Sequence, residues 1–224
     1  MVKEISSEMV KEYGLQAGAG VVGIAASKDF ASAPDGCKPS DNLENCISVI
    51  ILGAPIQREA MLGEDTIGFI DKRNALNEKM TDIAKNVAKH IKAGGYKAKA
   101  INGMGGKWVN GMQFGHISLK HAATLAGLGI IGKNYLLYNA EYGNLLWFSA
   151  VLTDAELVQD KKAKYTICSK CNKCVAICPS KALDNPVLFG KKACADNMFK
   201  KINGKWEIMF FLCRKVCPSR FGKK

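Results

Sequence analysis

Residues 168–179 read Cys-Ser-Lys-Cys-Asn-Lys-Cys-Val-Ala-Ile-Cys-Pro. Three cysteines at intervals of three positions form a tight loop that can hold one iron-sulfur cluster, and the fourth cysteine of such a run ligates a second cluster. Zinc knuckles differ, because their Cys-x2-Cys pairs are separated by a longer loop. The spacing therefore predicts iron-sulfur ligands at Cys168, Cys171, Cys174 and Cys178.

The run is typical of bacterial two-cluster ferredoxins, and part of it occurs a second time. The segment Cys174-Val-Ala-Ile-Cys178-Pro is echoed by Cys213-Arg-Lys-Val-Cys217-Pro. The symmetry of the two arms assigns the ligands of each cluster. The first cluster, a [4Fe-4S] unit, is predicted to take Cys168, Cys171, Cys174 and Cys217; the second is predicted to take Cys178, Cys194 and Cys213.

The second cluster is one cysteine short. Glu207 and Phe210 stand where the repeat would place further thiols, which leaves Cys194 as the only other nearby one. Four alternatives are open: a [3Fe-4S] cluster, a [4Fe-4S] cluster whose fourth iron takes a water, carboxylate or substrate atom, a ligand from Cys37 or Cys46, or no second cluster. Packing as small apolar residues is the ordinary role of reduced Cys37 and Cys46.

The composition is that of an ordinary globular protein. The chain has 224 residues, of which 48% are hydrophobic and 23% charged. Nine cysteines, an odd number, argue against a disulfide framework and for metal or redox chemistry. Neither a signal peptide nor an apolar run of about twenty residues occurs in the sequence. We expect a cytoplasmic protein without a membrane partner.

Positive charge is concentrated at the C-terminal end. Residues 161–224 hold 16 Lys and Arg against 3 Asp and Glu, whereas residues 1–160 hold 16 against 17. Thiolate-bound clusters would balance part of this excess, and a basic surface also attracts anionic partners. The partners we expect are an electron donor such as a ferredoxin or flavodoxin, an acidic protein, and more weakly tRNA.

Residues 1–160 are predicted to form an α+β domain, followed by a cluster domain at 161–224. Apolar residues recur at helical spacing from Thr66 to Ala93, and Gly94-Gly95 follows as a stop. Further helices are predicted at 7–13 and 116–125, strands at 21–25, 47–52, 96–101, 135–138 and 145–152, and a glycine-rich loop at 102–115.

The segment Gly127-Leu-Gly-Ile-Ile-Gly-Lys-Asn134 resembles nucleotide-binding motifs but has the wrong context. The dinucleotide fingerprint must follow a strand and open a helix, and here a helix precedes the glycines and a strand follows. We interpret it as a helix stop whose glycines let the backbone approach a neighbour or cofactor. Candidate cofactor-binding residues are Gly129, Gly132, Lys133 and Asn134.

Three polar side chains precede these glycines. His116, Lys120 and His121 are expected on one short helix, with His116 and Lys120 one turn apart and therefore on one face. Such groups can donate protons or anchor anions beside a redox centre. They are the candidate catalytic residues, although an isolated histidine is more often structural.

The order of motifs resembles epoxyqueuosine reductases and their relatives, the reductive dehalogenases. The resemblance rests on 126–134, Leu136-Leu137, Glu141-Tyr-Gly143 and Val151-Leu-Thr-Asp154, followed by the cysteine module. The resemblance implies a nitroreductase-like domain that holds a corrinoid, a cofactor of the cobalamin type. It also implies a two-cluster ferredoxin-like domain that passes electrons to the cobalt of the corrinoid one at a time. FMN is the alternative cofactor.

The sequence also departs from that family. Epoxyqueuosine reductases carry an Asp, expected to be the proton donor, then Pro and Glu before the Ala-Gly-Leu-Gly stretch, where Gln113, His116 and Leu119 stand here. The helical extension that grips tRNA is absent from these 224 residues. We therefore expect an iron-sulfur oxidoreductase other than an epoxyqueuosine-reducing enzyme; the alternative is an electron-transfer protein or reductive activator without its own substrate.

Overall fold

The computed structural model describes residues 4–59, 66, 68–109, 112–185, 190–209 and 211–223. They divide into two compact units. Unit 1 comprises Met1–Pro55, Asn77–Gly129 and Trp147–Lys164, and unit 2 comprises Ile56–Leu76, Ile130–Leu146 and Tyr165–Lys224. The chain enters unit 2 for the last time at Tyr165, close to the boundary expected after residue 160, but two earlier segments also belong to unit 2.

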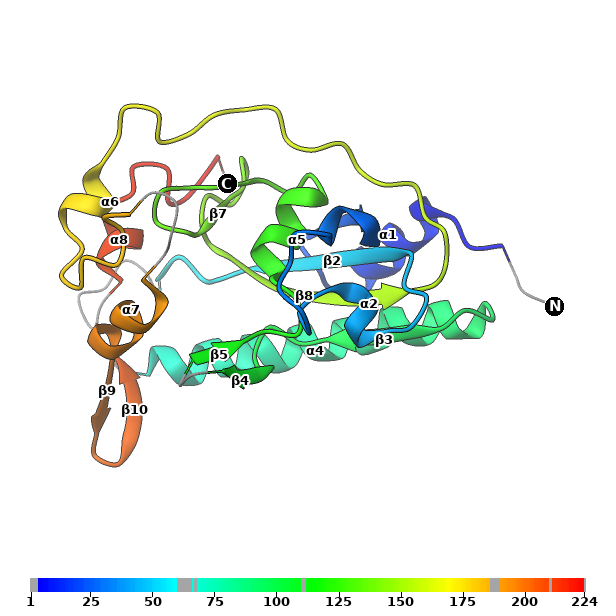
Figure 1. Cartoon of the computed structure of the whole chain (residues 1–224), viewed down its shortest axis with the longest axis horizontal. Coiled ribbons are helices and arrows are strands. Elements are labelled where there is room, and N and C mark those ends of the chain that lie inside the picture. Colours follow the sequence, from blue (N-terminus) through cyan, green and yellow to red (C-terminus); the bar gives the residue numbers. More distant parts are fainter. Residues whose placement is uncertain are drawn as a thin grey trace. The chain divides into compact units, whose positions relative to one another are not determined.

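Unit 1 is built on a four-stranded sheet in the order β1-β2-β8-β3 (Figure 1). The strands are β1 (Val21–Ala26), β2 (Ser48–Pro55), β3 (Ala98–Ile101) and β8 (Leu146–Thr153). The pairs β1-β2 and β3-β8 are antiparallel. The predicted α+β class is therefore confirmed, and the strands predicted at 21–25, 47–52, 96–101 and 145–152 are all present within a few residues.

Helices cover both faces of this sheet. They are α1 (Ser7–Gln16), η1 (Ser27–Phe30), α2 (Pro39–Asn42), α4 (Phe69–Ala93) and α5 (Leu119–Leu125). A Cβ on Gly14 of α1 would lie 2.7 Å from a Val22 methyl, and one on Gly23 would lie 2.5 Å from the Ala126 carbonyl. Because neighbouring strand residues point to opposite faces, α1 and the end of α5 pack on opposite sides of β1.

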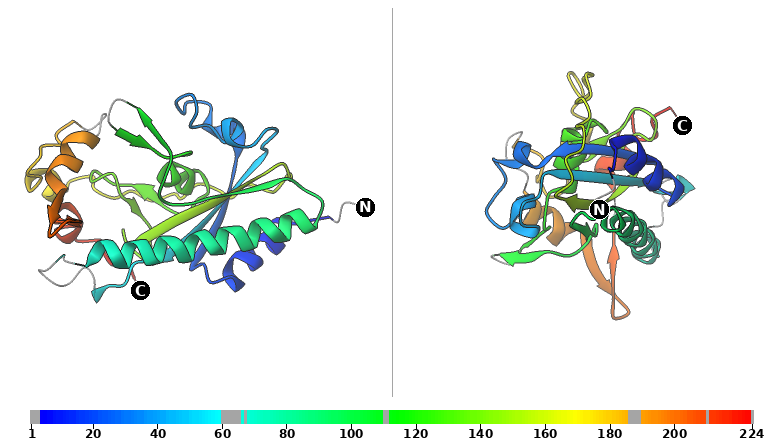
Figure 2. Two further views of the ribbon diagram at one scale, coloured as in Figure 1. Left: turned by 90° about the horizontal axis from the view of Figure 1, so that it is seen from below. Right: turned by 90° about the vertical axis from the view of Figure 1, so that its right-hand side faces the viewer.

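Helix α4 confirms the helix predicted at 66–93, apart from its first residues. It is the long helix, coloured turquoise to green, in the left-hand view of Figure 2. Met80, Ile83, Val87 and Ile91 are buried, as their helical spacing predicts. The part of α4 in unit 1 lies on the same side of the sheet as α1, because the Tyr13 ring stacks on His90 at 4.5 Å.

Asp160 connects three segments of unit 1. Its carboxylate accepts a hydrogen bond of 2.9 Å from the Ile24 amide and pairs with Lys11 at 2.5 Å.

Asp160→Ala is expected to lower the free energy of unfolding by about 1–3 kcal/mol, since it leaves the Ile24 amide unpaired. Denaturant titration measures this change. Asp82→Ala, which breaks the exposed Lys85 pair, is the control and should change it by less than about 1 kcal/mol; equal losses would contradict the role of Asp160.

The glycine-rich segment at 102–115 is not the loop that was predicted. Strands β4 (Lys107–Val109) and β5 (Met112–Phe114) form an antiparallel hairpin within it. The sequence between them is Asn-Gly, a pair that favours hairpin turns; these two residues, 110 and 111, lie outside the described residues. The flanking glycines concealed this signal.

Unit 2 contains short elements joined by loops. Its strands are β6 (Ile130–Ile131), β7 (Leu137–Tyr138), β9 (Phe199–Ile202) and β10 (Lys205–Ile208), and its helices are α6 (Lys173–Ala176), α7 (Lys191–Met198) and α8 (Leu212–Lys215). Strands β9 and β10 form a hairpin that projects beyond α7 (Figure 1). The strand predicted at 135–138 is confirmed only as β7.

In the part of the chain that the structure describes, no helix is both long and apolar enough to cross a lipid bilayer.

Candidate metal centre

All seven cysteines of the predicted module lie in unit 2 and are free thiols. Cys168 and Cys171 precede α6, Cys174 lies on α6, and Cys178 follows it. Cys194 lies on α7, Cys213 on α8, and Cys217 follows α8. The structure thus places one arm of the sequence repeat on α6 and the other on α8, with a cysteine at the same position of each short helix.

The two arms meet in space. Helices α6 and α8 contact one another, and Cys174 and Cys178 form a small apolar cluster with Ala182 and Leu183. Cys213 and Cys194 pack against its edge. Cysteines that are far apart in the sequence therefore share one packed region.

The electrostatic neighbours of Cys217 and Cys213 divide the thiols into two groups. Burial raises the pKa of the Cys217 thiol, and nearby Cys168 and Cys171 raise it further. Burial also raises the pKa of the Cys213 thiol; the positive charge of Arg214 opposes this, and Cys194 and Cys178 add to it. The groups are thus Cys168, Cys171 and Cys217 on one side, and Cys178, Cys194 and Cys213 on the other.

Cys174 has an electrostatic neighbour in each of the two groups. Burial raises the pKa of its thiol, with smaller contributions from Cys168 and Cys213, one from each group. A buried thiol with a raised pKa ionises reluctantly unless a cation compensates the thiolate, and iron does so in a cluster. The donor set, thiols alone in two groups, fits iron-sulfur clusters.

A single-ion site is a different arrangement. Zinc holds its thiolates at about 2.3 Å, so they crowd around one point, whereas a cluster spreads four thiolates over several irons. Among the described residues, no three or more His, Cys, Asp or Glu side chains are placed to hold a metal ion.

The loop at 132–134 contacts both cysteine arms. A Cβ on Gly132 would lie 3.4 Å from the Cys168 sulfur, so a glycine permits this approach. The Lys133 ammonium donates hydrogen bonds to the Cys171 carbonyl (3.1 Å) and to Asn172 (2.7 Å). The Asn134 amide donates to the Cys213 carbonyl at 3.3 Å. Three of the four candidate cofactor-binding residues therefore lie against cysteine-bearing backbone.

Gly129, the fourth of these candidates, is the last residue of its segment in unit 1. The nearby Gly127 has a φ of +72° just after α5, and Leu128 donates to the Ala123 carbonyl at 2.9 Å. A left-handed glycine with such a bond is a common helix C-terminus. The interpretation of this segment as a helix stop, followed by strand β6, is confirmed.

Comparisons with known proteins agree with this geometry. A curated epoxyqueuosine reductase from Atelocyanobacterium thalassa (isolate ALOHA) is 33% identical over 142 residues, which is 56% of this chain and 46% of that protein. A crystal structure of epoxyqueuosine reductase with an epoxyqueuosine-modified tRNA stem loop superposes with a TM-score of 0.66 at 18% identity, over 95% of this chain and 64% of the other. The chain is a divergent relative of the epoxyqueuosine reductases.

The chain also shares its fold with a reductive dehalogenase whose structure suggests a mechanism for B12-dependent dehalogenation. That superposition has a TM-score of 0.64 at 20% identity and covers 93% of this chain and 28% of the dehalogenase. No family model matches the chain. The match to the curated A. thalassa protein spans less than half of that protein's length.

The candidate catalytic residues lie in unit 1. Helix α5 begins at Leu119, so His116 lies outside it, and the predicted helix face shared by His116 and Lys120 is wrong. The backbone at Ser118 is extended, and its hydroxyl lies 2.6 Å from Nδ1 of His121. Burial, aided by the charge of Lys120, lowers the pKa of His121.

Phe210, which replaces a cysteine in the second arm, lies outside the described residues. Glu207, at the other such position, is buried on β10, and its carboxylate accepts a hydrogen bond of 3.3 Å from the Gly68 amide. Cys37 and Cys46 belong to unit 1. The Cys46 thiol is partly buried and lies 3.5 Å from the Ser48 carbonyl, and burial raises its pKa.

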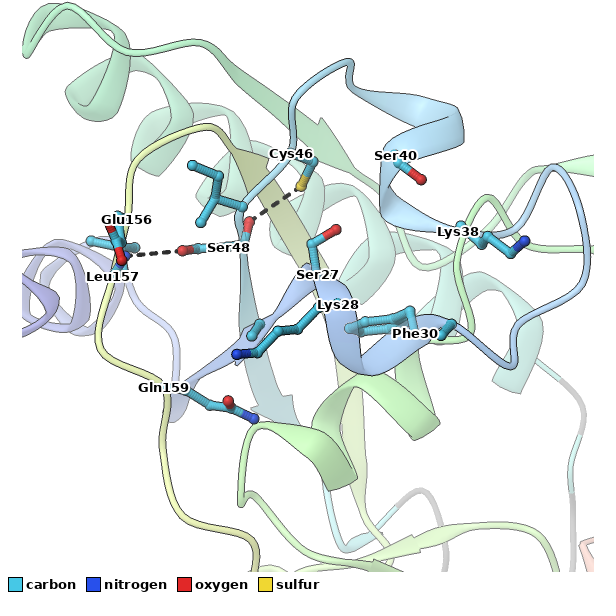
Figure 3. Close-up of a pocket in the computed structure, with 13 residues that line it drawn as sticks. Ser27, Lys28, Phe30, Lys38, Ser40, Cys46, Ser48, Glu156, Leu157 and Gln159 are labelled. Atoms are coloured by element: carbon cyan, nitrogen blue, oxygen red, sulfur yellow. Dashed lines mark hydrogen bonds between the residues drawn. The ribbon is translucent and has the colours of Figure 1, made fainter.

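Unit 1 contains a pocket of about 620 Å³ between the start of β2 and the segment after β8 (Figure 3). Its lining includes Ser27, Cys46 and Ser48 and the side chains of Lys28 and Lys38. None of the candidate catalytic residues belongs to its described lining. The pocket is separate from the predicted sites.

Sequence reasoning missed Arg214 and Asn144. Arg214 donates to the carbonyl oxygen of Asn144 and to its side-chain oxygen, the latter at 3.4 Å. One signal was available in the sequence, because Arg214 follows Cys213 where the other arm has the apolar Val175 after Cys174.

Proposed function

We propose that this chain is an iron-sulfur oxidoreductase whose clusters pass low-potential electrons to a cofactor or substrate held by the N-terminal domain. One observation carries the proposal: the two arms of the repeat contact one another in unit 2, where Cys174, Cys178, Cys194 and Cys213 share one packed region. Clusters supply one-electron transfer when bound. The curated protein that is 33% identical to this chain is named a reductase, which supports the same class of reaction.

The ligand sets follow from the thiol groups. The first group, Cys168, Cys171 and Cys217, would hold a [4Fe-4S] cluster. Cys174 would be its fourth ligand. Cys178, Cys194 and Cys213 would hold the second cluster, either [3Fe-4S] or a [4Fe-4S] unit with a ligand other than cysteine. In this assignment unit 2 is a ferredoxin-like module.

The chain's other residues have supporting roles in this proposal. Lys133 and Asn134 would hold the two cysteine-bearing loops in place through their carbonyl contacts. The Lys133 ammonium also places positive charge beside a loop that would carry anionic ligands. His116, Lys120 and His121 stay the candidate groups for proton donation.

The cofactor of the N-terminal domain is proposed from the relatives. The dehalogenase neighbour is connected with B12 chemistry, which favours a corrinoid over FMN in a nitroreductase-like domain. A corrinoid would supply a cobalt centre that accepts electrons one at a time. An epoxyqueuosine reductase neighbour holds a tRNA stem loop, which makes tRNA a candidate partner alongside a ferredoxin or flavodoxin as electron donor.

A second candidate is an electron carrier or reductive activator. The excess of Lys and Arg within 161–224 favours it, because a basic surface near the clusters would attract an acidic redox protein. A carrier would bind no chromophore besides iron and sulfur, and its complex would weaken as salt is added.

Metal analysis tests the proposal. The protein is purified without oxygen, supplied with cobalamin, and analysed for iron, sulfide and cobalt. We expect about eight irons per chain for two [4Fe-4S] clusters, or about seven if the second is [3Fe-4S], with cobalt retained. Iron without cobalt would favour the carrier or a flavin enzyme. A protein without iron would refute the proposal.

A further inference from the structure

Arg214 lies in the sequence between one cysteine of each thiol group. It is on α8, directly after Cys213, and its carbonyl accepts a hydrogen bond of 3.2 Å from the backbone amide of Cys217. Both thiols are also electrostatic neighbours of its guanidinium. One arginine is therefore adjacent to a proposed ligand of each cluster.

The guanidinium of Arg214 is a partly buried charge, since an arginine stays protonated at neutral pH. Its hydrogen bonds to Asn144 are to neutral oxygens. None of the ion pairs among the described residues involves Arg214. A partly buried cation without a carboxylate partner is costly, which points to an anion as its partner.

Its surroundings contain further donors without partners. Within the described residues, Nδ2 of Asn144 and Nε of Arg220 are buried and have no hydrogen-bond acceptor. The backbone N–H of Asn144 donates a hydrogen bond of 3.0 Å to the backbone carbonyl of Arg220, so these two residues are neighbours. The charge of Arg220 also lowers the pKa of Cys217. Among the described residues of this region, two buried donors therefore have no acceptor, and the charges of Arg214 and Arg220 have no carboxylate partner.

We propose that Arg214 is a shared counter-cation of both clusters and raises their reduction potentials. The inference rests on the proposed function. Thiolate-bound clusters are anionic, and reduction adds one more negative charge from the electron donor. A fixed positive charge in a medium of low dielectric stabilises the reduced form more than the oxidised form. Asn144 is the positioning residue that holds the guanidinium.

The test is a redox titration of the cluster-loaded protein, followed by EPR spectroscopy. Arg214→Gln is expected to lower the equilibrium constant for reduction of each cluster at least tenfold, which is 59 mV for one electron. Arg214→Lys should restore part of the loss. Lys205→Gln removes the same charge from the exposed β10 strand and should leave both potentials unchanged.

Asn144→Asp is a second variant, useful if Arg214→Gln does not retain its clusters. It is nearly isosteric, and its carboxylate beside the guanidinium would cancel the charge, so the potentials should again fall. Unchanged potentials in either cluster-loaded variant, or an equal fall in Lys205→Gln, would overturn the inference and leave the proposed function intact. Wild-type protein without iron would overturn both.

Discussion

Cys217→Ala is expected to abolish the first cluster while Cys168, Cys171 and Cys174 remain. Cys217 is the thiol that the second arm contributes to this group, where Cys168 and Cys171 are its electrostatic neighbours. A [4Fe-4S] cluster that loses one of four thiolates is bound poorly, so iron content should fall by about half. Iron and sulfide analysis with EPR spectroscopy measures the loss.

Cys37→Ala is the matched control for this variant. Cys37 is a free, partly buried thiol of unit 1 and belongs to neither thiol group. Its replacement should leave iron content and spectra unchanged. If Cys217→Ala retained full iron and the spectrum of the first cluster, the proposed ligand set would be incorrect.

Gly143→Ala is expected to destabilise unit 2 strongly. Gly143 has a φ of +60°, and a Cβ there would lie 2.1 Å from the Arg220 carbonyl oxygen, which is far inside contact distance. Left-handed backbone costs an alanine about 1–2 kcal/mol, and overpacking adds about 1–3 kcal/mol. We expect a loss of about 2–5 kcal/mol in denaturant unfolding, together with loss of the cluster that Cys217 holds.

Gly204→Ala separates the two costs. Gly204, in the β9–β10 turn, has a φ of +83°, and no atom lies within 4 Å of a Cβ there. Its replacement should therefore cost only the backbone strain of about 1–2 kcal/mol. Equal losses for the two variants would show that contact with Arg220 contributes nothing at Gly143.

Periodicity and spacing were sufficient for much of this chain. The helical spacing of Met80, Ile83, Val87 and Ile91 predicts α4 because a long amphipathic pattern has few competing structures. The apolar run in β2 likewise predicts a buried strand. The internal repeat pairs Cys174 with Cys213, and the structure places these two cysteines at the same position of α6 and α8.

Local turns and helix ends were harder to predict. The hairpins β4–β5 and β9–β10 both have Asn-Gly between their strands, at Asn110-Gly111 and Asn203-Gly204, but their strands are too short for a clear alternation of apolar residues. The start of α5 was placed too early because His116 fits the helical spacing. The role of Arg214 depends on the loop that brings Asn144 to α8, and no local pattern encodes that contact.

The meeting of the two cysteine arms also affects how the chain folds. Cys217 lies far along the sequence from Cys168 and Cys171, so bringing them together closes a long loop and costs entropy. A cluster bound to both arms would act as a cross-link, much as a disulfide restricts an unfolded chain. Cys168, Cys171 and Cys174 are close in sequence and can capture iron early, whereas Cys217 would complete the site only after the intervening α7 and β9–β10 segment has folded.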